Sequence, residues 1–201
     1  IARGRAGGRV KTRVLSQLSA AEACDLHREL VLWTTARLLD AGLGAVDLAV
    51  AGSPEHPLFT DCRERGLATV TRQRGDDLGE RMYCALADSL QRFERVILVG
   101  SDCPGIDRDY LAKAVEALDD AGVVLGPALD GGYVLLGATM VHADMFEGIV
   151  WGTDRVLAET RERLRRLGLD WTELAPLADI DWPQDLPAWE AIKRAGKAHK
   201  S

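Results

Sequence analysis

Apolar residues in this chain occur in short continuous runs that alternate with longer segments of helical spacing. The run VILV at 96–99 leads into a turn of small residues, so it predicts a strand that is covered on both faces. Ser19 and Glu22 form the capping box of a helix that Gly42 ends. Further strands are predicted at 45–51, 68–71, 123–125 and 169–174. Further helices are predicted at 58–65, in a segment that contains Leu86 and Leu90, and in the segments that begin after Asp107, Thr153 and Pro183. This order predicts an α/β fold.

Polar loops follow the strands of this pattern. They are the basic, glycine-rich segment 3–13 and the segments GDDLGER at 75–81, SDCPG at 101–105, LDGGY at 129–133 and DIDWPQD at 179–185. In an open α/β sheet, the loops that leave the carboxyl ends of the strands converge, and ligands bind among them. We therefore expect these loops to lie along one rim of a single sheet and to form one binding site.

The segment 3–13 combines the residue types that wrap phosphate groups. Its glycines, including Gly8, let the backbone approach a ligand closely, and Arg9, Lys11 and Arg13 supply charged hydrogen-bond donors. The segment is not a Walker A loop, because valine rather than glycine precedes Lys11. A solvated basic arm would have the same composition, so the segment alone leaves both interpretations open.

Acidic residues in the other loops are the candidate metal ligands. Asp102 follows the 96–99 strand, and Asp179 and Asp181 lie two residues apart, so in an extended chain their side chains point to the same side. Two carboxylates ~4 Å apart repel by about 4 kcal/mol at an effective dielectric of 20, so such a pair implies a bound metal or a shared proton. Magnesium fits best, since water and phosphate complete its shell. The pattern favours a metal-dependent enzyme that acts on a nucleoside di- or triphosphate.

Each loop also has a purely structural interpretation. The sequence around Asp102 is good turn chemistry in any protein, and Asp76 or Asp77 can cap the helix that follows. Asp130 with its two following glycines is typical of a hairpin turn, although the Gly-Pro before it makes the connection longer and leaves Asp130 able to face a ligand.

Composition and charge narrow the class of protein. The chain of 201 residues suits one domain, and its net charge of −6 argues against general nucleic-acid binding. No apolar run approaches the length of about 18 residues that a membrane span needs and no signal peptide is recognisable, so we expect a cytoplasmic protein. The four cysteines form no C-x-x-C pair and are expected to be buried or incidental, although Cys103 beside Asp102 is a candidate reactive thiol.

Successive blocks of the chain, in order, resemble one bacterial family. They are GRVKTR at 8–13, GD at 75–76 with LGERM at 78–82, GSDCPG at 100–105, GP at 126–127 with DGGY at 130–133, Trp151 with Thr153, and DID at 179–181. This set is similar to the GT-A-fold transferases known as radical-SAM/selenoprotein-associated glycosyltransferases. It is more distantly similar to molybdenum-cofactor and 2-phospholactate guanylyltransferases. The chain departs from the family at Arg5 and Gly7, where prolines are usual, and at Trp182, where threonine is usual.

The resemblance implies a single GT-A-like (nucleotide-diphospho-sugar transferase) domain over residues 1–194, with a mixed, mostly parallel central sheet between helices. Its first strand would be truncated, and residues 195–201 would form a flexible tail. The resemblance makes Asp102 a ligand of Mg²⁺ or Mn²⁺, with Asp179 or Asp181 as the second acid, and places Asp130 on the acceptor side as the candidate catalytic base. The nucleotide- and phosphate-binding residues would be Gly8, Arg9, Lys11, Arg13, Gly75, Asp76, Gly79, Arg81, Ser101, Gly131 and Gly132.

The function that follows is transfer of a glycosyl group from a nucleotide-activated sugar to an unknown acceptor. One alternative is a nucleotidyltransferase that attacks the α-phosphate of a nucleoside triphosphate and releases pyrophosphate. A second alternative is a non-catalytic nucleotide-binding module. We expect neither a nucleic-acid partner nor a membrane span, and the sequence leaves a homodimer open.

Overall fold

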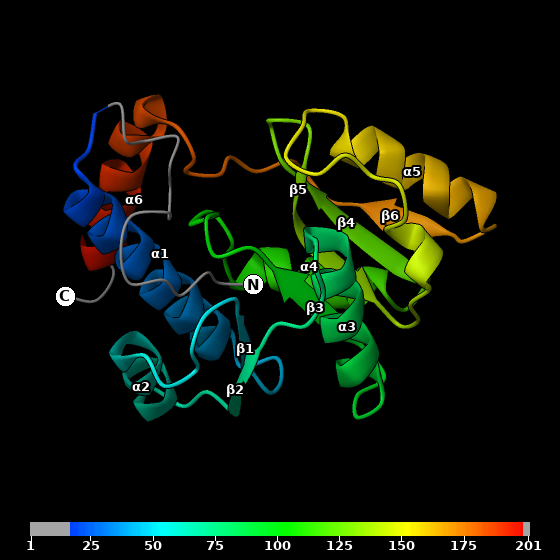
Figure 1. The fold of residues 1–201 in the computed structure, drawn as a ribbon, viewed down its shortest axis with the longest axis horizontal. Helices are drawn as coiled ribbons and strands as arrows, with labels where there is room; N and C mark the ends of the chain where they lie inside the picture. The colour runs from blue at the N-terminus through cyan, green and yellow to red at the C-terminus, as the bar shows by residue number, and fades with distance from the viewer. Residues whose placement is uncertain (1–16, 199–201) are drawn as a thin grey trace.

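Helices and strands alternate along the chain, as the hydrophobic pattern predicts. The computed structural model describes residues 17–198 (Figure 1). The elements in chain order are α1 (Ala20–Ala41), β1 (Asp47–Val50), α2 (Pro57–Glu64), β2 (Thr69–Arg72), α3 (Leu78–Leu90), β3 (Val96–Val99), α4 (Arg108–Ala117), β4 (Val123–Pro127), β5 (Tyr133–Ala138), the short 3-10 helix η2 (Ala143–Met145), α5 (Val156–Arg166), β6 (Trp171–Glu173), the short 3-10 helix η3 (Pro183–Asp185) and α6 (Leu186–Ala198). The predicted strands and helices in this range are all present, with ends that differ by a few residues.

The strands form two sheets within residues 17–198, where the sequence analysis predicts one. A four-stranded sheet has the order β3-β5-β4-β6; β5 pairs in antiparallel fashion with β3 and β4, and β4 pairs in parallel with β6, so this sheet is mixed as predicted but its pairings are mostly antiparallel. The strands β1 and β2 pair in parallel with each other. An ion pair between Arg92 and Asp47, 3.6 Å long and largely exposed, links the segment before β3 to β1. No described strand bridges the two sheets, and the expectation of a single sheet is not met in this range.

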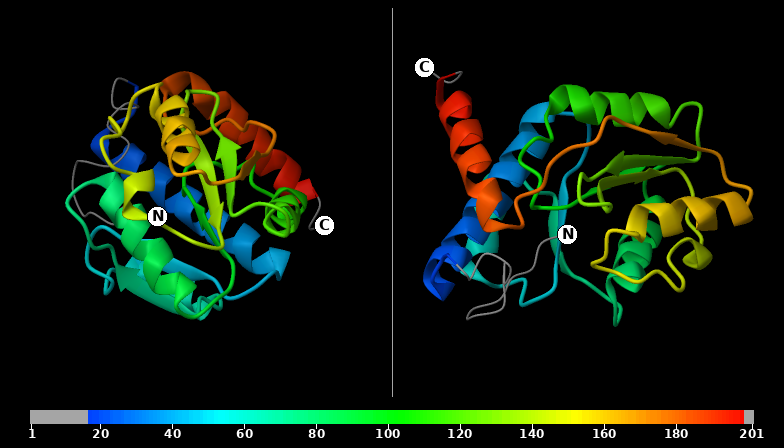
Figure 2. Two further views of the ribbon diagram at one scale, coloured as in Figure 1. Left: turned by 90° about the vertical axis from the view of Figure 1, so that its right-hand side faces the viewer. Right: turned by 90° about the horizontal axis from the view of Figure 1, so that it is seen from above.

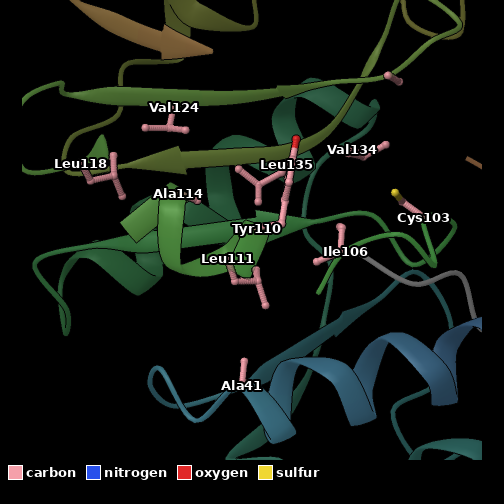
Figure 3. Packing of buried hydrophobic residues seen from close by; sticks show 11 residues of the cluster. Ala41, Cys103, Ile106, Tyr110, Leu111, Ala114, Leu118, Val124, Val134 and Leu135 are labelled. Atoms are coloured by element: carbon pink, nitrogen blue, oxygen red, sulfur yellow. The ribbon is translucent and has the colours of Figure 1, made fainter. Parts of the chain in front are cut away.

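Helices cover both faces of the four-stranded sheet (Figure 2). On one face, Leu111 of α4 belongs to the same buried cluster as Val124 of β4 and Leu135 of β5 (Figure 3). On the other face, Val123 and Leu125 join a cluster with residues of α3 and α5. Neighbouring residues of β4 thus enter opposite clusters, as the two-residue period of a strand requires.

Strand β3 shows the same alternation. Ile97 and Val99 pack on the side of α4, and Val96 and Leu98 pack on the side of α3 and α5. The prediction that both faces of this strand are packed against other elements is therefore confirmed. All four side chains are nevertheless half-buried, because β3 is the outer strand of the sheet that the described residues form.

The long helix α1 begins and ends where the sequence predicts. The Ser19 hydroxyl accepts a hydrogen bond from the Glu22 N–H, and the Glu22 carboxylate accepts one from the Ser19 N–H at 2.8 Å. Gly42 ends the helix in the left-handed conformation, which glycine adopts without strain. The same local rule holds for α4, where the Asp107 carboxylate accepts from the Tyr110 N–H at 2.8 Å.

Helix α6 packs along α1, far from the four-stranded sheet (Figure 1). The rings of Trp33 and Trp189 meet edge to face with their centroids 5.3 Å apart, and Lys193 forms an ion pair with Glu29 at 2.9 Å. The helix extends to Ala198 and so includes residues 195–198 of the segment predicted as a tail.

The start of α5 differs from its prediction. The helix begins at Val156 after Arg155, and Thr153 does not cap it. The Thr153 hydroxyl instead donates to the Val150 carbonyl at 2.8 Å within the preceding turn. Across residues 17–198, none of the helices combines the length and the hydropathy that crossing a membrane requires.

Candidate functional site

Backbone hydrogen bonds join the loops after β3, β4 and β6 at one rim of the sheet. The Leu129 N–H, after β4, donates to the Leu177 carbonyl, after β6, at 3.1 Å. The Ile180 N–H donates to the Asp102 carbonyl at 2.9 Å, which ties the segment after β6 to the loop after β3. The predicted convergence is therefore confirmed for these three loops, whereas the loop GDDLGER follows β2 of the other sheet and segment 3–13 lies outside the described residues.

Asp102 is half-buried at this rim, and its neighbour orients it. The Ser101 side chain is buried, and its hydroxyl donates to Asp102 Oδ1 at 3.2 Å. Phosphate binding by Ser101 stays a prediction, and the structure shows its hydroxyl bonded to the carboxylate beside it. The arrangement fixes one oxygen of Asp102.

Cys103 connects Asp102 to Asp179. Its thiol donates to the Ala178 carbonyl at 3.4 Å. Burial raises the pKa of this thiol to about 12, and the charges of Asp179 and Asp102 add to the rise. Both carboxylates therefore act on the same sulfur atom, although they come from loops on different strands.

Asp181 lies two residues further along, where the chain turns towards α6. Its N–H donates to Asp185 Oδ2 at 3.0 Å, and the Trp182 N–H donates to the same oxygen at 2.7 Å. The side chains of Asp179 and Asp181 are both half-buried, and both residues, like Asp102, take part in further interactions. Both acids flank Ile180, whose N–H donates to the Asp102 carbonyl, and the Cys103 thiol contacts the Ala178 carbonyl directly before Asp179.

We expect Cys103 to resist alkylation in the folded protein, contrary to its candidacy as a reactive thiol. Its side chain is 2% exposed and its pKa is raised, so little thiolate forms at pH 8. Mass spectrometry after iodoacetamide treatment should find the half-buried Cys24 and Cys84 labelled first, and Cys103 labelled only after unfolding.

The raised pKa of Cys103 also has a consequence for stability. In the unfolded chain the thiol ionises near its ordinary pKa of 9.0, but in the folded protein it ionises only at a pKa of about 12. The thiol therefore contributes stability below pH 9 that is lost as the pH rises through this window. Rapid labelling of Cys103 in the native state at pH 8 would contradict both statements.

The turn between β4 and β5 contains Asp130, Gly131 and Gly132. The two strands pair in antiparallel fashion, so the hairpin interpretation of this segment is correct. Asp130 Oδ1 accepts from the Gly132 N–H at 2.9 Å, and the Gly131 N–H donates to the Ala128 carbonyl at 3.3 Å. The amide groups predicted to bind phosphate are thus used within the turn, while the Asp130 side chain is exposed at the rim.

The loop GDDLGER is closed on itself by hydrogen bonds. Asp77 caps α3 by accepting from the Glu80 N–H at 2.8 Å, and Glu80 accepts from the Asp76 N–H at 2.7 Å. The Arg81 guanidinium donates to the carbonyls of Gly75 and Asp76 at 2.9 and 3.0 Å. The capping interpretation is therefore correct for Asp77, and Arg81, which the resemblance makes a nucleotide-binding residue, holds the backbone of this loop.

Segment 146–155 links this loop to the hairpin turn. A methyl group added at Gly79, the second residue of α3, would lie 2.8 Å from the Trp151 ring. One added at Gly131 would lie 2.1 Å from the Asp154 carbonyl oxygen. Glycine is therefore required at both positions for close packing, which explains two of the predicted site glycines without a ligand.

Two side chains of α1 reach the Asp102 loop, and no pattern in the sequence predicts these contacts. The Thr34 hydroxyl donates to the Ser101 carbonyl at 3.2 Å, and the Trp33 indole N–H donates to the Pro104 carbonyl at 3.2 Å. The signal that could have identified them is a pair of adjacent threonines, Thr34 and Thr35, in the middle of a helix. Such residues are unfavourable there unless tertiary contacts use their hydroxyl groups.

Two predicted parts of the site are not formed by the described residues. Gly8, Arg9, Lys11 and Arg13 lie outside residues 17–198. In the part of the chain that the structure describes, no three His, Cys, Asp or Glu side chains are grouped to hold a metal ion by themselves. A cation at this rim would therefore need ligands from the substrate or from water.

The fold is that of a class of nucleotide-using transferases. A chain from Desulfovibrio desulfuricans G20, described as a putative nucleotide-diphospho-sugar transferase, superposes with a TM-score of 0.74 at 30% sequence identity, over 87% of this chain and 77% of that chain. CMP:2-keto-3-deoxy-manno-octonic acid synthetase complexed with CTP superposes with a TM-score of 0.56 at 14% identity, over 83% and 88%. The 2-C-methyl-D-erythritol 4-phosphate cytidylyltransferase from Thermus thermophilus gives 0.55 at 18%, over 82% and 88%. The predicted nucleotide-diphospho-sugar transferase fold is thus confirmed.

The sequence also identifies the family to which the chain belongs. Residues 34–153 match the family described as "Uncharacterized protein conserved in bacteria (DUF2064)". The match spans more than half of the chain, and the protein belongs to this family. No curated protein matches the sequence significantly.

Proposed function

We propose that this protein is a metal-dependent glycosyltransferase of the radical-SAM/selenoprotein-associated group, which takes its sugar from a nucleotide-activated donor. The observation that carries the proposal is the meeting of the loops of Asp102 and Asp179 at the rim of the sheet, where the Ile180 N–H donates to the Asp102 carbonyl at 2.9 Å and the Cys103 thiol donates to the Ala178 carbonyl at 3.4 Å. The 30% identity to the D. desulfuricans protein supports a nucleotide-diphospho-sugar as the donor.

The donor set at this rim fits Mg²⁺ or Mn²⁺. Both ions prefer carboxylate, phosphate and water oxygens, and Mg²⁺ is commonly held by one or two carboxylates with the rest of its shell supplied by substrate. Asp102 and Asp179 would hold the ion, with Asp181 as the other candidate second ligand. When bound, the ion would stabilise the negative charge of the leaving diphosphate.

The residues of the chain itself would bind and position the two substrates. Arg9, Lys11 and Arg13 would bind the phosphates, and the loop 75–81, held by Arg81, would lie beside the nucleoside. The bond between the sugar and the diphosphate breaks and a bond to the acceptor oxygen forms. Asp130, exposed at the rim and oriented by the Gly132 N–H, would take the acceptor proton.

A thermal-shift screen of sugar nucleotides and nucleoside triphosphates, each with and without Mn²⁺, tests the proposal. A ligand that binds only the folded state at a hundredfold excess over Kd adds about 2.7 kcal/mol of stability, which such a screen detects. We expect sugar nucleotides to raise the melting temperature only when Mn²⁺ is present. Absence of any shift with metal would contradict the proposal.

Nucleotidyl transfer is the second candidate, and the cytidylyltransferases of the same fold favour it. The reactions differ in their products, because nucleotidyl transfer releases pyrophosphate and glycosyl transfer releases a nucleoside diphosphate. Pyrophosphate release from a nucleoside triphosphate mixed with phosphorylated acids would support the second candidate. Slow release of nucleoside diphosphate from a sugar nucleotide would support the first, and metal-dependent binding without either product would indicate a non-catalytic nucleotide-binding module.

A further inference from the structure

Every backbone carbonyl from Ser101 to Pro104 accepts a hydrogen bond. The Asp102 carbonyl accepts from the Ile180 N–H at 2.9 Å, and the Cys103 carbonyl accepts from the Ile106 N–H at 3.4 Å. The other two donors come from side chains of α1, as described above. The loop that carries Asp102 is therefore held at its first and last residues by one helix.

The two donors on α1 are themselves fixed. Thr34 is buried, with 6% of the residue exposed, so its hydroxyl has little access to solvent as an alternative partner. The Trp33 ring is packed edge to face against Trp189 of α6, and the Arg37 guanidinium lies 4.6 Å from its centroid. These contacts set the plane of the indole and direct its N–H to the Pro104 carbonyl.

We propose that Thr34 and Trp33 are positioning residues for Asp102, through which the pair formed by α1 and α6 sets the affinity of the site for a nucleotide-bound divalent cation. This inference rests on the proposed function. The Ser101 carbonyl, which Thr34 holds, belongs to the peptide bond directly before Asp102, so a shift of this peptide moves the carboxylate. Groups that orient a metal ligand typically change metal affinity by about 10–100-fold when they are removed.

A purely structural role of Thr34 would change stability alone, whereas a positioning role would also change the affinity for the cation and nucleotide. Thr35 offers a matched control for Thr34. Thr35 is the next residue of α1 and is equally buried, at 3% exposed, but its hydroxyl lies 4.0 Å from Cys62 Sγ, among the residues that pack against β1. Thr34→Val and Thr35→Val remove the same hydroxyl group from neighbouring buried positions. Only the first touches the Asp102 loop.

The experiment measures four quantities on wild type, Thr34→Val, Thr35→Val and Thr34→Ser. They are the melting temperature, the amide chemical shifts and hydrogen exchange of residues 101–104, and the affinity for Mn²⁺ with whichever of ADP, CDP, GDP and UDP stabilises the wild type most. We expect similar melting temperatures for the two valine variants. We expect changed amides at Ser101 and Asp102 and about tenfold weaker binding in Thr34→Val alone, with recovery in Thr34→Ser.

A second pair of variants tests the indole donor. Trp33→Phe keeps an aromatic ring against α6 but removes the N–H that reaches Pro104, and the same weakening of binding is expected. Trp189→Phe is its control, because the Trp189 N–H donates to Glu29 rather than to the loop. Weaker binding in Trp33→Phe but not in Trp189→Phe would support the proposal.

The outcomes separate the two proposals. Equal affinities in Thr34→Val and Thr35→Val, or unchanged amides at 101–104 in Thr34→Val, would overturn the positioning role while the proposed function stands. Wild-type protein that binds none of the four nucleoside diphosphates with Mn²⁺ would overturn the proposed function, and the positioning inference would fall with it.

Discussion

Asp102→Asn should abolish metal-dependent nucleotide binding while leaving the fold intact. The variant keeps the shape of the side chain and an oxygen that can accept from the Ser101 hydroxyl, but it removes the negative charge. We expect the affinity for Mn²⁺ with a nucleoside diphosphate to fall by more than about 100-fold, because loss of a ligand exceeds the loss of a group that only orients one. Calorimetric titration of wild type and variant measures this.

The control for Asp102→Asn is Asp120→Asn, which removes one carboxylate from an exposed position beyond α4. Both variants should melt within about 3 °C of wild type, a shift that corresponds to roughly 1 kcal/mol in a chain of this size. Equal affinities of wild type and Asp102→Asn would remove Asp102 from the metal site. A collapse of the melting temperature would show instead that the carboxylate is mainly structural.

The features that the sequence predicts well are those decided by a few consecutive residues. The capping box at Ser19, the cap at Asp107 and the apolar run of β3 each contain their physical cause within a short segment. The cap predicted at Thr153 is wrong, because the Thr153 hydroxyl donates to the Val150 carbonyl instead of accepting from an N–H of α5. The sequence near a polar side chain shows which backbone groups it could bond to, but not whether it will cap the helix or bond within the preceding turn.

Features that depend on distant residues could not be predicted. Thr34 and Ser101 are 67 residues apart, and no spacing rule connects the middle of a helix to a loop after a strand. The meeting of the Asp102 loop with the segment of Asp179 and Asp181 likewise depends on the contact of Cys103 with Ala178. The resemblance to a family identifies the candidate residues of the site, and the tertiary structure shows the residues to which they are hydrogen-bonded.

The internal hydrogen bonds of the loops give several predicted site residues a structural role. The amides of Gly131 and Gly132 and the guanidinium of Arg81 all bond to their own loops. These groups hold the backbone in shape before any substrate arrives, which lowers the ordering cost of binding. The exposed Asp130 and the half-buried Asp102 and Asp179 carry the charges at the rim that this scaffold positions.

Gly131→Ala should destabilise the protein by about 3–5 kcal/mol, the sum of two separate effects. Its φ of +89° lies in a region that alanine adopts only with strain. In addition, the new methyl group would lie 2.1 Å from the Asp154 carbonyl oxygen, so the backbone of segment 146–155 must move. Urea denaturation at low temperature measures the free energy of unfolding.

Gly152→Ala separates the two effects, because Gly152 has a similar φ of +82° but nothing within 4 Å of the added methyl group. This variant should lose only about 1–2 kcal/mol, the cost of strain. The difference between the two variants then measures the close approach between the hairpin turn and segment 146–155. Equal losses would show that the added methyl group is accommodated without a steric cost and would contradict the close approach of the two segments.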